Sequence, residues 1–161
     1  MTLRFAILTV SDRSSRGERP DTSGPALVEL VQSQGWQVVG QRIVPDEVGE
    51  IQQAMQAWSD SGQADVILAT GGTGFAPRDV TPEATRAIVE RLTPGLDEAM
   101  RSASLQVTAH AMLSRSVSGI RKRTLIITLP GSPKGATENL QVVLPALEHA
   151  IQLLREEPAG H

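Results

Sequence analysis

The chain has 161 residues, a length typical of one domain, and a domain of this size buries roughly 70% of the surface of its unfolded chain. Its net charge of −3 and aromatic share of 2% lack the basic surface and stacking side chains of nucleic-acid-binding proteins. No apolar run is long enough to span a bilayer, and the absence of cysteine excludes disulfides and thiolate catalysis. The composition therefore predicts a cytoplasmic protein that acts on small molecules, with no membrane or nucleic-acid partner.

Four apolar runs rich in β-branched residues predict strands, at residues 5–10, 38–44, 66–70 and 124–129. The segments between them have helical periodicity. This alternation predicts an α/β fold, a three-layer sandwich whose mostly parallel central sheet is flanked by helices. In the first connecting helix we expect an inward face of Leu27, Leu30 and Val31. In the second we expect an inward face of Val48, Ile51, Met55 and Trp58.

The third connecting helix has recognisable start signals. Thr81 is expected to be its N-cap residue and Pro82 to take the first helical position. Its inward face would consist of Ala84, Ile88 and Val89.

The next segment is less regular. Pro94 and Gly95 predict a break before a helix at residues 96–105. Residues 116–121 predict a short extra strand that a tight connection joins to the last strand of the sheet.

The C-terminal part predicts a long helix at residues 136–155, in which Pro145 would cause a kink or break. We expect residues 1–155 to form a single domain. Residues 156–161 are expected to be a flexible tail.

Right-handed crossovers place every strand-to-helix loop of a parallel sheet at the same edge. Four such loops contain small hydroxyl, glycine or carboxylate residues: TVSDRSSRG at 9–17, VPDE at 44–47, TGGTGFAPRD at 70–79 and LPGSPKG at 129–135. This composition is typical of a pocket for a phosphorylated ligand. We therefore expect these loops to form the functional site.

The glycines Gly71, Gly72 and Gly74 lie where a strand passes into a helix. Because they lack a Cβ, their backbone can adopt positive φ and let a phosphate approach its N–H groups. A tight turn is the alternative, but three glycines with Thr73 between them favour anion binding. The sequence contains no P-loop motif, and Pro77 stands where the third glycine of a dinucleotide-binding motif would be.

Two aspartates, Asp46 and Asp79, follow strands at the same edge. Carboxylates beside a phosphate repel it unless a cation intervenes, and Mg²⁺ commonly bridges carboxylates to substrate phosphates. The pair therefore indicates a magnesium nucleotide. Alternatively, Asp79 forms a salt bridge with Arg78 or caps a helix, and Asp46 forms a turn or caps the helix ahead of Glu47.

Three other polar residues of these loops have less specific signals. Lys134 either contacts a phosphate or is simply solvated. Ser11 and Ser132 are candidate nucleophiles, but no G-x-S-x-G motif surrounds them and no histidine is placed near either loop, which disfavours a hydrolase.

Several stretches closely resemble the molybdopterin adenylyltransferase family, which includes bacterial MogA and MoaB proteins and the G domains of gephyrin and of the plant molybdenum-cofactor protein. They are TVSD at 9–12, D-x-SGP at 21–25, IVPDE at 43–47, LATGGTGFAPRDVTPEAT at 68–85, MLSRSVSGIR at 112–121 and TLIITLPGSPKG at 124–135. The resemblance covers essentially the whole chain, and the block at 68–85 is long enough to be highly specific.

The resemblance implies a homotrimeric α/β protein of molybdenum cofactor biosynthesis. Such a protein uses Mg-ATP to adenylylate molybdopterin, a pterin with a dithiolene and a terminal phosphate, and releases pyrophosphate. Because the fused partner domain of gephyrin is missing, a separate metal-insertion protein of the MoeA type would use the product. A non-catalytic molybdopterin-binding or scaffolding module is the alternative, and the presence of both Asp46 and Asp79 favours the enzyme.

By the same resemblance, Asp46 and Asp79 are the catalytic aspartates and would hold Mg²⁺. The residues of the family's nucleotide loop correspond to Gly71, Gly72, Thr73 and Gly74. Residues of the loops that line the substrate site correspond to Ser11, Asp12, Ser23, Ser132 and Lys134.

Overall fold

A computed structural model describes residues 1–158 and contains one six-stranded sheet in the order β2-β1-β3-β6-β5-β4. The strands are β1 (Arg4–Val10), β2 (Gln37–Val44), β3 (Val66–Thr70), β4 (Arg91–Leu92), β5 (Gly119–Arg121) and β6 (Thr124–Leu129). Neighbours among β1, β2, β3 and β6 pair in parallel, whereas β5 pairs antiparallel with both β6 and β4. The prediction of a mostly parallel α/β sheet is confirmed.

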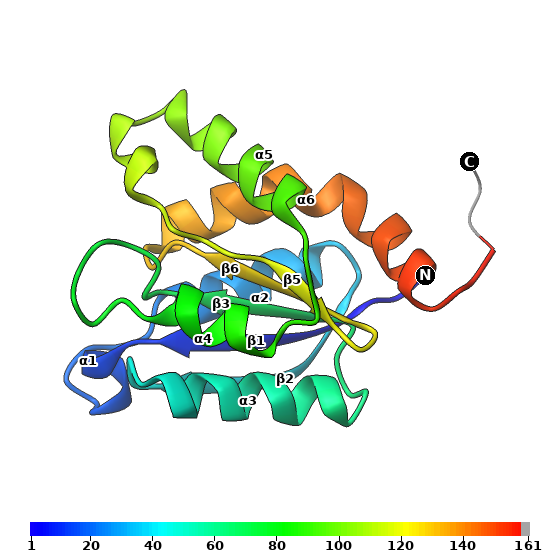
Figure 1. Ribbon diagram of the computed structural model, residues 1–161, viewed down its shortest axis with the longest axis horizontal. Helices are drawn as coiled ribbons and strands as arrows, with labels where there is room; N and C mark the ends of the chain where they lie inside the picture. The colour runs from blue at the N-terminus through cyan, green and yellow to red at the C-terminus, as the bar shows by residue number, and fades with distance from the viewer. Residues whose placement is uncertain (159–161) are drawn as a thin grey trace.

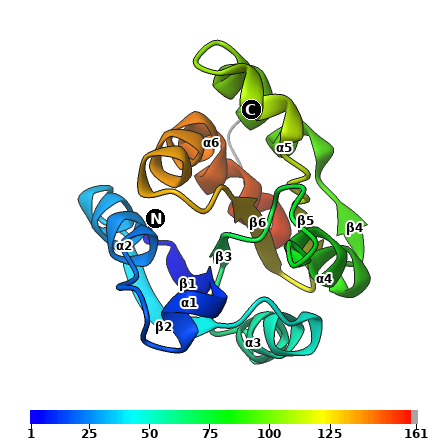
Figure 2. The same cartoon turned by 90° about the vertical axis from the view of Figure 1, so that its left-hand side faces the viewer.

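Helices cover both faces of the sheet, as Figures 1 and 2 show. They are α1 (Asp12–Ser15), α2 (Ser23–Ser33), α3 (Val48–Asp60), α4 (Thr81–Ile88), α5 (Pro94–Leu105) and α6 (Pro133–Leu154), with the 3₁₀ helix η1 (Ala109–Leu113). One apolar core lies between the sheet and α2, α5 and α6, and a second lies between the sheet and α3 and α4. The fold is therefore the expected three-layer sandwich.

The central strands β1, β3 and β6 are mainly apolar and are buried at nearly every position, because both of their faces are covered. In β1, Phe5 and Ile7 belong to the first core, and Ala6 and Leu8 belong to the second. Residues on one face follow a period of two, so a continuous apolar run supplies both cores at once.

The first helices agree with their predicted inward faces except at Val48. Leu30 of α2 is partly buried and packs against the first core, whereas Val48 is 39% exposed. Val48 is the first residue of α3, so the expectation that it faces the core is wrong.

The N-cap prediction for α4 is also wrong. The N-cap residue is Val80, and Thr81 is the first helical residue. The hydroxyl of Thr81 donates instead to the carbonyl oxygen of Gly71, at 2.8 Å. Thr81 therefore bonds to the glycine loop and does not cap α4. Ala84 and Ile88 are buried as expected.

Both predictions of helix breaks at proline need correction. The fifth helix includes Pro94 and Gly95 in its first turn, where the missing N–H of proline has no helical partner to lose. The last helix runs without a break through Pro145, which lies on its exposed side, where water can hydrate the carbonyl that lost its partner.

The remaining outcomes concern short elements and the C-terminus. The extra strand β5 exists but is shorter than predicted, and the sequence signals missed both β4 and α1. Of the predicted tail, residues 156–158 follow the end of α6, and residues 159–161 lie outside the described residues. No helix within residues 1–158 is long and apolar enough to cross a membrane.

The carboxyl ends of the four parallel strands lie at one edge of the sheet, next to α1 (Figure 1). Figure 2 looks onto this edge, where the loops after β1, β2, β3 and β6 gather. This is the position at which the predicted site was expected.

Candidate active site

The four predicted loops line a hollow of about 520 Å³ at the carboxyl edge, which we call hollow A. It brings together most of the predicted site residues, which lie far apart in the sequence. These are Ser11, Asp12, Ser23, Asp46, Gly71, Gly72, Asp79 and Ser132. The topology of the sheet, rather than any local motif, assembles them.

A second hollow of about 480 Å³, hollow B, lies between the glycine loop, α5, η1 and α6. It shares part of its lining with hollow A, namely Gly72, Asp79, Gly131 and Ser132. Its further lining includes the apolar side chains of Met100, Val107, Ala111 and Leu113. Thr73 and Gly74 line hollow B and not hollow A, so the predicted nucleotide loop is divided between the two.

The first two glycines of the loop have backbone conformations that other residues rarely adopt. Gly71 has φ of +104° and Gly72 has φ of +68°. A Cβ on Gly71 would lie 2.3 Å from the carbonyl oxygen of Val10, and one on Gly72 would lie 2.4 Å from Oγ1 of Thr81 and 3.0 Å from Oδ1 of Asp46. Both positions therefore require glycine, for conformation and for space.

The N–H groups of this loop are not equally available to a ligand. That of Gly71 donates to the carbonyl oxygen of Leu129, at 3.1 Å, and so continues the sheet. Within residues 1–158, no hydrogen bond engages the N–H groups of Gly72, Thr73 and Gly74. These three are the donors that can meet an anion.

The third glycine does not meet the expectation of positive φ, because Gly74 lies outside the left-handed region. Its lack of a side chain serves a close approach instead, since a Cβ there would lie 3.0 Å from Oδ2 of Asp79. That oxygen accepts the N–H of Ala76 at 2.9 Å and closes a turn in the loop. Asp79 therefore neither pairs with Arg78 nor caps α4, which were its alternative roles.

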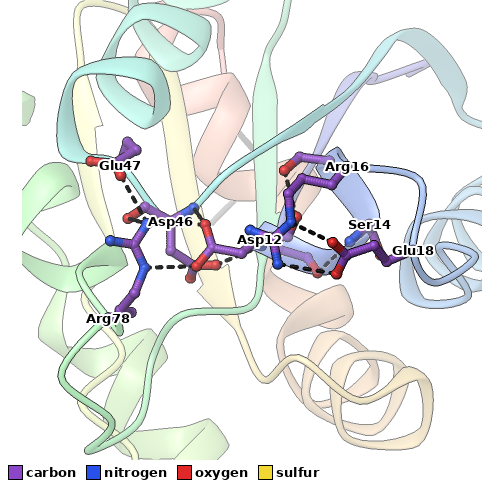
Figure 3. A network of polar contacts seen from close by, with 9 residues as sticks. Asp12, Ser14, Arg16, Glu18, Asp46, Glu47 and Arg78 are labelled. Carbon is purple, nitrogen blue, oxygen red and sulfur yellow. Dashed lines mark hydrogen bonds and ion pairs between the residues drawn. The ribbon is translucent and has the colours of Figure 1, made fainter.

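A network of charged groups joins the loops after β1, β2 and β3 (Figure 3). Oδ2 of Asp46 accepts the N–H of Asp12 at 2.8 Å, and Oδ1 of Asp12 accepts the N–H of Asp46 at 3.0 Å. The guanidinium of Arg78 binds Asp12 at 2.7 and 3.0 Å and Glu47 at 2.8 Å. Asp46 thus fixes two loops together, and its side chain does not cap α3, whose N-cap is Glu47.

The pKa values of Asp12 and Asp46, the two carboxyl groups at the centre of this network, are shifted in opposite directions. The hydrogen bonds from Arg78 are the largest cause of the lowered pKa of Asp12. The pKa of Asp46 is raised, mainly because burial disfavours its charge, and repulsion from Asp12 and Asp79 adds to this effect. A cation bound near Asp46 would relieve both penalties.

The donor set of hollow A fits a magnesium ion that arrives with a phosphorylated ligand. Oδ1 of Asp46 and Oδ1 of Asp79 accept no hydrogen bond within residues 1–158, and both residues line the hollow. In the same part of the chain, no three acidic or histidine side chains gather to hold a metal by themselves. Two carboxylates completed by phosphate oxygens and water are a typical environment for Mg²⁺.

Arg115 is a site residue that the sequence signals missed as an individual. Its N–H donates to the carbonyl oxygen of Thr73 at 2.8 Å, and its guanidinium donates to the carbonyl oxygens of Gly74 at 2.8 Å and Asp79 at 2.7 Å. It also pairs with Glu83 of α4. Arg115 therefore holds the glycine loop in place, and the resemblance of residues 112–121 to the family was the available signal.

A family model described as a probable molybdopterin binding domain matches residues 6–149. The chain belongs to this family. It is 49% identical to gephyrin of Dictyostelium discoideum over 162 residues, covering 94% of this chain and 22% of that protein. It is 39% identical to a molybdopterin adenylyltransferase of Helicobacter pylori strain J99, covering 95% of this chain and 88% of that protein.

Solved structures agree with this assignment. The molybdopterin biosynthesis enzyme MoaB of Thermus thermophilus is 50% identical and superposes with a TM-score of 0.91, over 98% of this chain and 99% of that one. The family predicted from the sequence is therefore confirmed. The chain spans only about a fifth of the length of Dictyostelium gephyrin but most of the bacterial relatives.

In this molybdopterin-binding domain, the site serines have structural contacts. Oγ of Ser11 accepts the N–H of Ser14 at 3.1 Å, and Oγ of Ser132 accepts the N–H of Gly135 at 3.0 Å, so both cap helices. Oγ of Ser23 donates to the carbonyl oxygen of Gly131 at 2.6 Å. These hydroxyl groups shape the loops that line hollow A.

Two other expectations about the site change with the structure. His110 lines hollow B together with Ser132, so a histidine does lie near the last loop, although no hydrogen bond joins the two side chains. The side chain of Lys134 is 80% exposed, pairs with Glu138 at 4.0 Å and lines neither hollow. The solvated alternative describes Lys134 better than phosphate contact.

Proposed function

We propose that the chain is a molybdopterin adenylyltransferase of molybdenum cofactor biosynthesis. It would join the terminal phosphate of molybdopterin to the adenylyl group of ATP and release pyrophosphate. Its similarity to the Helicobacter enzyme of that name, over most of both chains, supports this reaction. The observation that carries the proposal is the shared wall of hollows A and B, because two phosphorylated substrates must meet at one place.

The two hollows differ in a way that assigns the substrates. Hollow A offers the free backbone N–H of Gly72 and the carboxylates Asp46 and Asp79, which suit a magnesium triphosphate. Hollow B offers apolar side chains from α5 and η1, which suit a flat pterin ring. In-line transfer requires the attacking and leaving oxygens on opposite sides of the phosphorus, and substrates held in two hollows that share a wall are compatible with this requirement.

The reaction needs no covalent bond to the protein. An oxygen of the molybdopterin phosphate attacks the α-phosphorus of ATP. The bond from that phosphorus to the bridging oxygen breaks, and its electron pair leaves with pyrophosphate. The protein positions the two phosphates through the N–H groups of Gly72, Thr73 and Gly74, and Asp46 and Asp79 would hold Mg²⁺, which neutralises phosphate charge.

Several finer features stay predictions. We expect the domain to occupy residues 1–155, to assemble as a homotrimer in the cytoplasm and to pass its product to a separate metal-insertion protein of the MoeA type. Light scattering that shows only monomer at micromolar concentration would contradict the prediction of a homotrimer.

One experiment tests the proposed reaction directly. The purified chain is incubated with Mg-ATP and molybdopterin, and the adenylylated product and pyrophosphate are measured with and without a magnesium chelator. We expect both products in equal amounts, and neither when magnesium is removed. Tight molybdopterin binding without product would contradict the enzymatic function and support the alternative, a non-catalytic binding or scaffolding module.

A further inference from the structure

The segment between β1 and α2 contributes two arginines to hollow A, Arg13 and Arg19. Arg13 belongs to α1, and Arg19 lies between α1 and the start of α2. Both side chains are exposed at the hollow, together with the glycine loop and the loop after β6. Neither arginine was among the individual site residues predicted from the sequence.

Neither guanidinium has an ion pair or hydrogen-bond partner within residues 1–158. Arg16, between them in sequence, is different because Glu18 binds it at 2.8 and 3.1 Å (Figure 3). Glu18 acts on Arg13 only over a longer distance. Arg13 and Arg19 are therefore free cations on a segment where the neighbouring arginine is neutralised.

The charge of hollow A makes these free cations important. Its carboxylates are Asp12, Asp21, Asp46 and Asp79. Arg78 neutralises Asp12 from outside the hollow, and a magnesium ion would be shared by Asp46 and Asp79. A bound triphosphate still adds more negative charge than one such ion compensates. Arginine is suited to supply the rest, because its planar guanidinium can donate two parallel hydrogen bonds to a phosphate.

We propose that Arg13 and Arg19 bind the β- and γ-phosphates of ATP and then the pyrophosphate that leaves. This inference rests on the proposed function, in which hollow A holds the nucleotide. When the bond between the α-phosphorus and the bridging oxygen breaks, the negative charge that develops on the leaving pyrophosphate is met by the two guanidinium groups. The transfer itself then requires no proton from the protein.

A binding experiment tests the two arginines without the reaction. Inorganic pyrophosphate and AMP are titrated calorimetrically, in the presence of Mg²⁺, into the wild type and the double variant Arg13→Ala/Arg19→Ala. The matched control is Arg42→Ala/Arg91→Ala, which removes the same charge from exposed arginines of β2 and β4 that line neither hollow. Both test side chains are exposed and unpartnered, so their truncation leaves the packing intact.

We expect the double variant to bind pyrophosphate about 10- to 100-fold more weakly than the wild type, the loss typical of charge-assisted hydrogen bonds. Its affinity for AMP should stay within about twofold, and the control should match the wild type for both ligands. Equal losses for AMP and pyrophosphate, equal losses in the control, or no pyrophosphate binding by the wild type would each overturn the inference.

A second readout separates this inference from the proposed function. Single-turnover adenylyl transfer at saturating molybdopterin should show a raised ATP requirement and a slower maximal rate in the double variant. If the wild type binds pyrophosphate through these arginines but makes no adenylylated molybdopterin, the reaction is wrong and the phosphate-binding role stands. If transfer occurs and pyrophosphate binding ignores both arginines, the role is wrong and the reaction stands.

Discussion

The amino and carboxyl edges of the same sheet each contain an aspartate whose pKa is affected by burial, Asp65 and Asp46, and their surroundings contrast. At the amino edge, Asp65 accepts bonds from the backbone and side chain of Arg4, at 2.8 to 3.1 Å, and pairs with Arg155 at 2.8 Å. Burial acts to raise the pKa of Asp65, but the hydrogen bonds from Arg4 and Arg155 outweigh it and the pKa is lowered.

At the carboxyl edge, no arginine within residues 1–158 binds the carboxylate of Asp46. It accepts one backbone N–H, and burial and the neighbouring carboxylates Asp12 and Asp79 raise its pKa. The charge of Asp65 is matched within the fold, whereas under the proposed function the charge of Asp46 is matched by a bound magnesium ion. This difference indicates that the amino edge serves stability and that the carboxyl edge gives up some stability for binding.

The largest expected effect is on catalysis at the carboxyl edge. The variant Asp79→Asn removes a charge, but its amide oxygen can still accept the N–H of Ala76. If Asp79 helps to hold Mg²⁺, adenylyl transfer should slow by about 10² to 10³-fold, the order seen when one electrostatic stabiliser of a transition state is lost. Molybdopterin binding and the melting temperature should change little. Single-turnover assays and thermal melts measure these quantities.

A matched control for this variant is Asp21→Asn, which removes a charge of hollow A whose two oxygens are already bonded to Thr9 and Gly24. It should slow transfer far less than Asp79→Asn. Without magnesium, Asp79→Asn should bind ATP as well as the wild type or more tightly, because a charge that repels phosphate is gone. Near-normal magnesium-dependent turnover would contradict the metal role.

The next effect is on stability at the amino edge. The variant Asp65→Ala leaves Arg4 and Arg155 without their buried acceptor, so the free energy of unfolding should fall by about 2 to 3 kcal/mol, moderated by the partial exposure of both arginines. Turnover per folded molecule should stay near that of the wild type. Asp60→Ala, which removes a more exposed carboxylate from its pair with Arg121, should cost less than Asp65→Ala.

The loss of unfolding free energy in Asp65→Ala should depend on pH in the direction set by the lowered pKa of Asp65. The pKa of Asp65 is lowered by folding, so its contribution is present above the unfolded pKa, near ~3.9, and is lost as the pH falls through the lower folded value. Urea denaturation of wild type and Asp65→Ala should therefore converge as the solution is acidified below about pH 4. A difference that grows on acidification would contradict this account.

A smaller effect compares two glycines with the same backbone strain. Gly72 has φ of +68° and Gly62 has φ of +71°, but an added Cβ meets Thr81 and Asp46 only at Gly72 and nothing within 4 Å at Gly62. Gly62→Ala should cost about 1 kcal/mol for strain alone. Gly72→Ala should cost more and also weaken ATP binding about tenfold, since the contact shifts the loop that offers the free N–H groups.

Substitution at Gly72 should therefore affect folding as well as binding, because Thr81 of α4 packs against the same position. Calorimetric ATP titrations and chemical denaturation of both variants measure the two effects. Equal stability losses for Gly62→Ala and Gly72→Ala would show that the contact is relieved without cost.

The parts of this molecule that the sequence predicted are those with local or topological causes. The strands at 66–70 and 124–129 were predicted with correct ends because burial on both faces favours a mainly apolar run. The meeting of Asp46 and Asp79 at one edge followed from the handedness of the crossovers.

The parts that were missed depend on partners distant in sequence. Thr81 has the composition of an N-cap, yet its hydroxyl binds Gly71. Arg78 is adjacent to Asp79 but pairs with Asp12, which no short-range rule connects to it. Hollow B was missed because α5 and η1 contribute to it through apolar and small side chains that also occur in ordinary cores.

The smallest expected effect is on the stability of a variant at Asp46, and it tests whether Asp46 differs from Asp65 as described above. Folding raises the pKa of Asp46, so the folded state disfavours its charge. The resulting loss of stability is present above the raised pKa and disappears as the pH falls toward the unfolded value. The variant Asp46→Asn keeps an acceptor for the N–H of Asp12 and removes the charge. Without ligand it should be slightly more stable than the wild type at neutral pH, by less than about 1 kcal/mol, and this advantage should shrink near pH 4.

Addition of Mg-ATP should reverse the order. The wild type gains stability from a ligand that completes the charge of Asp46, and the variant gains little because it binds that ligand poorly. Thermal melts of both proteins at neutral and acidic pH, with and without Mg-ATP, measure the four values needed. A variant that is less stable than the wild type at neutral pH without ligand would place Asp46 in the same structural role as Asp65, and the functional interpretation of the carboxyl edge would then lack its energetic basis.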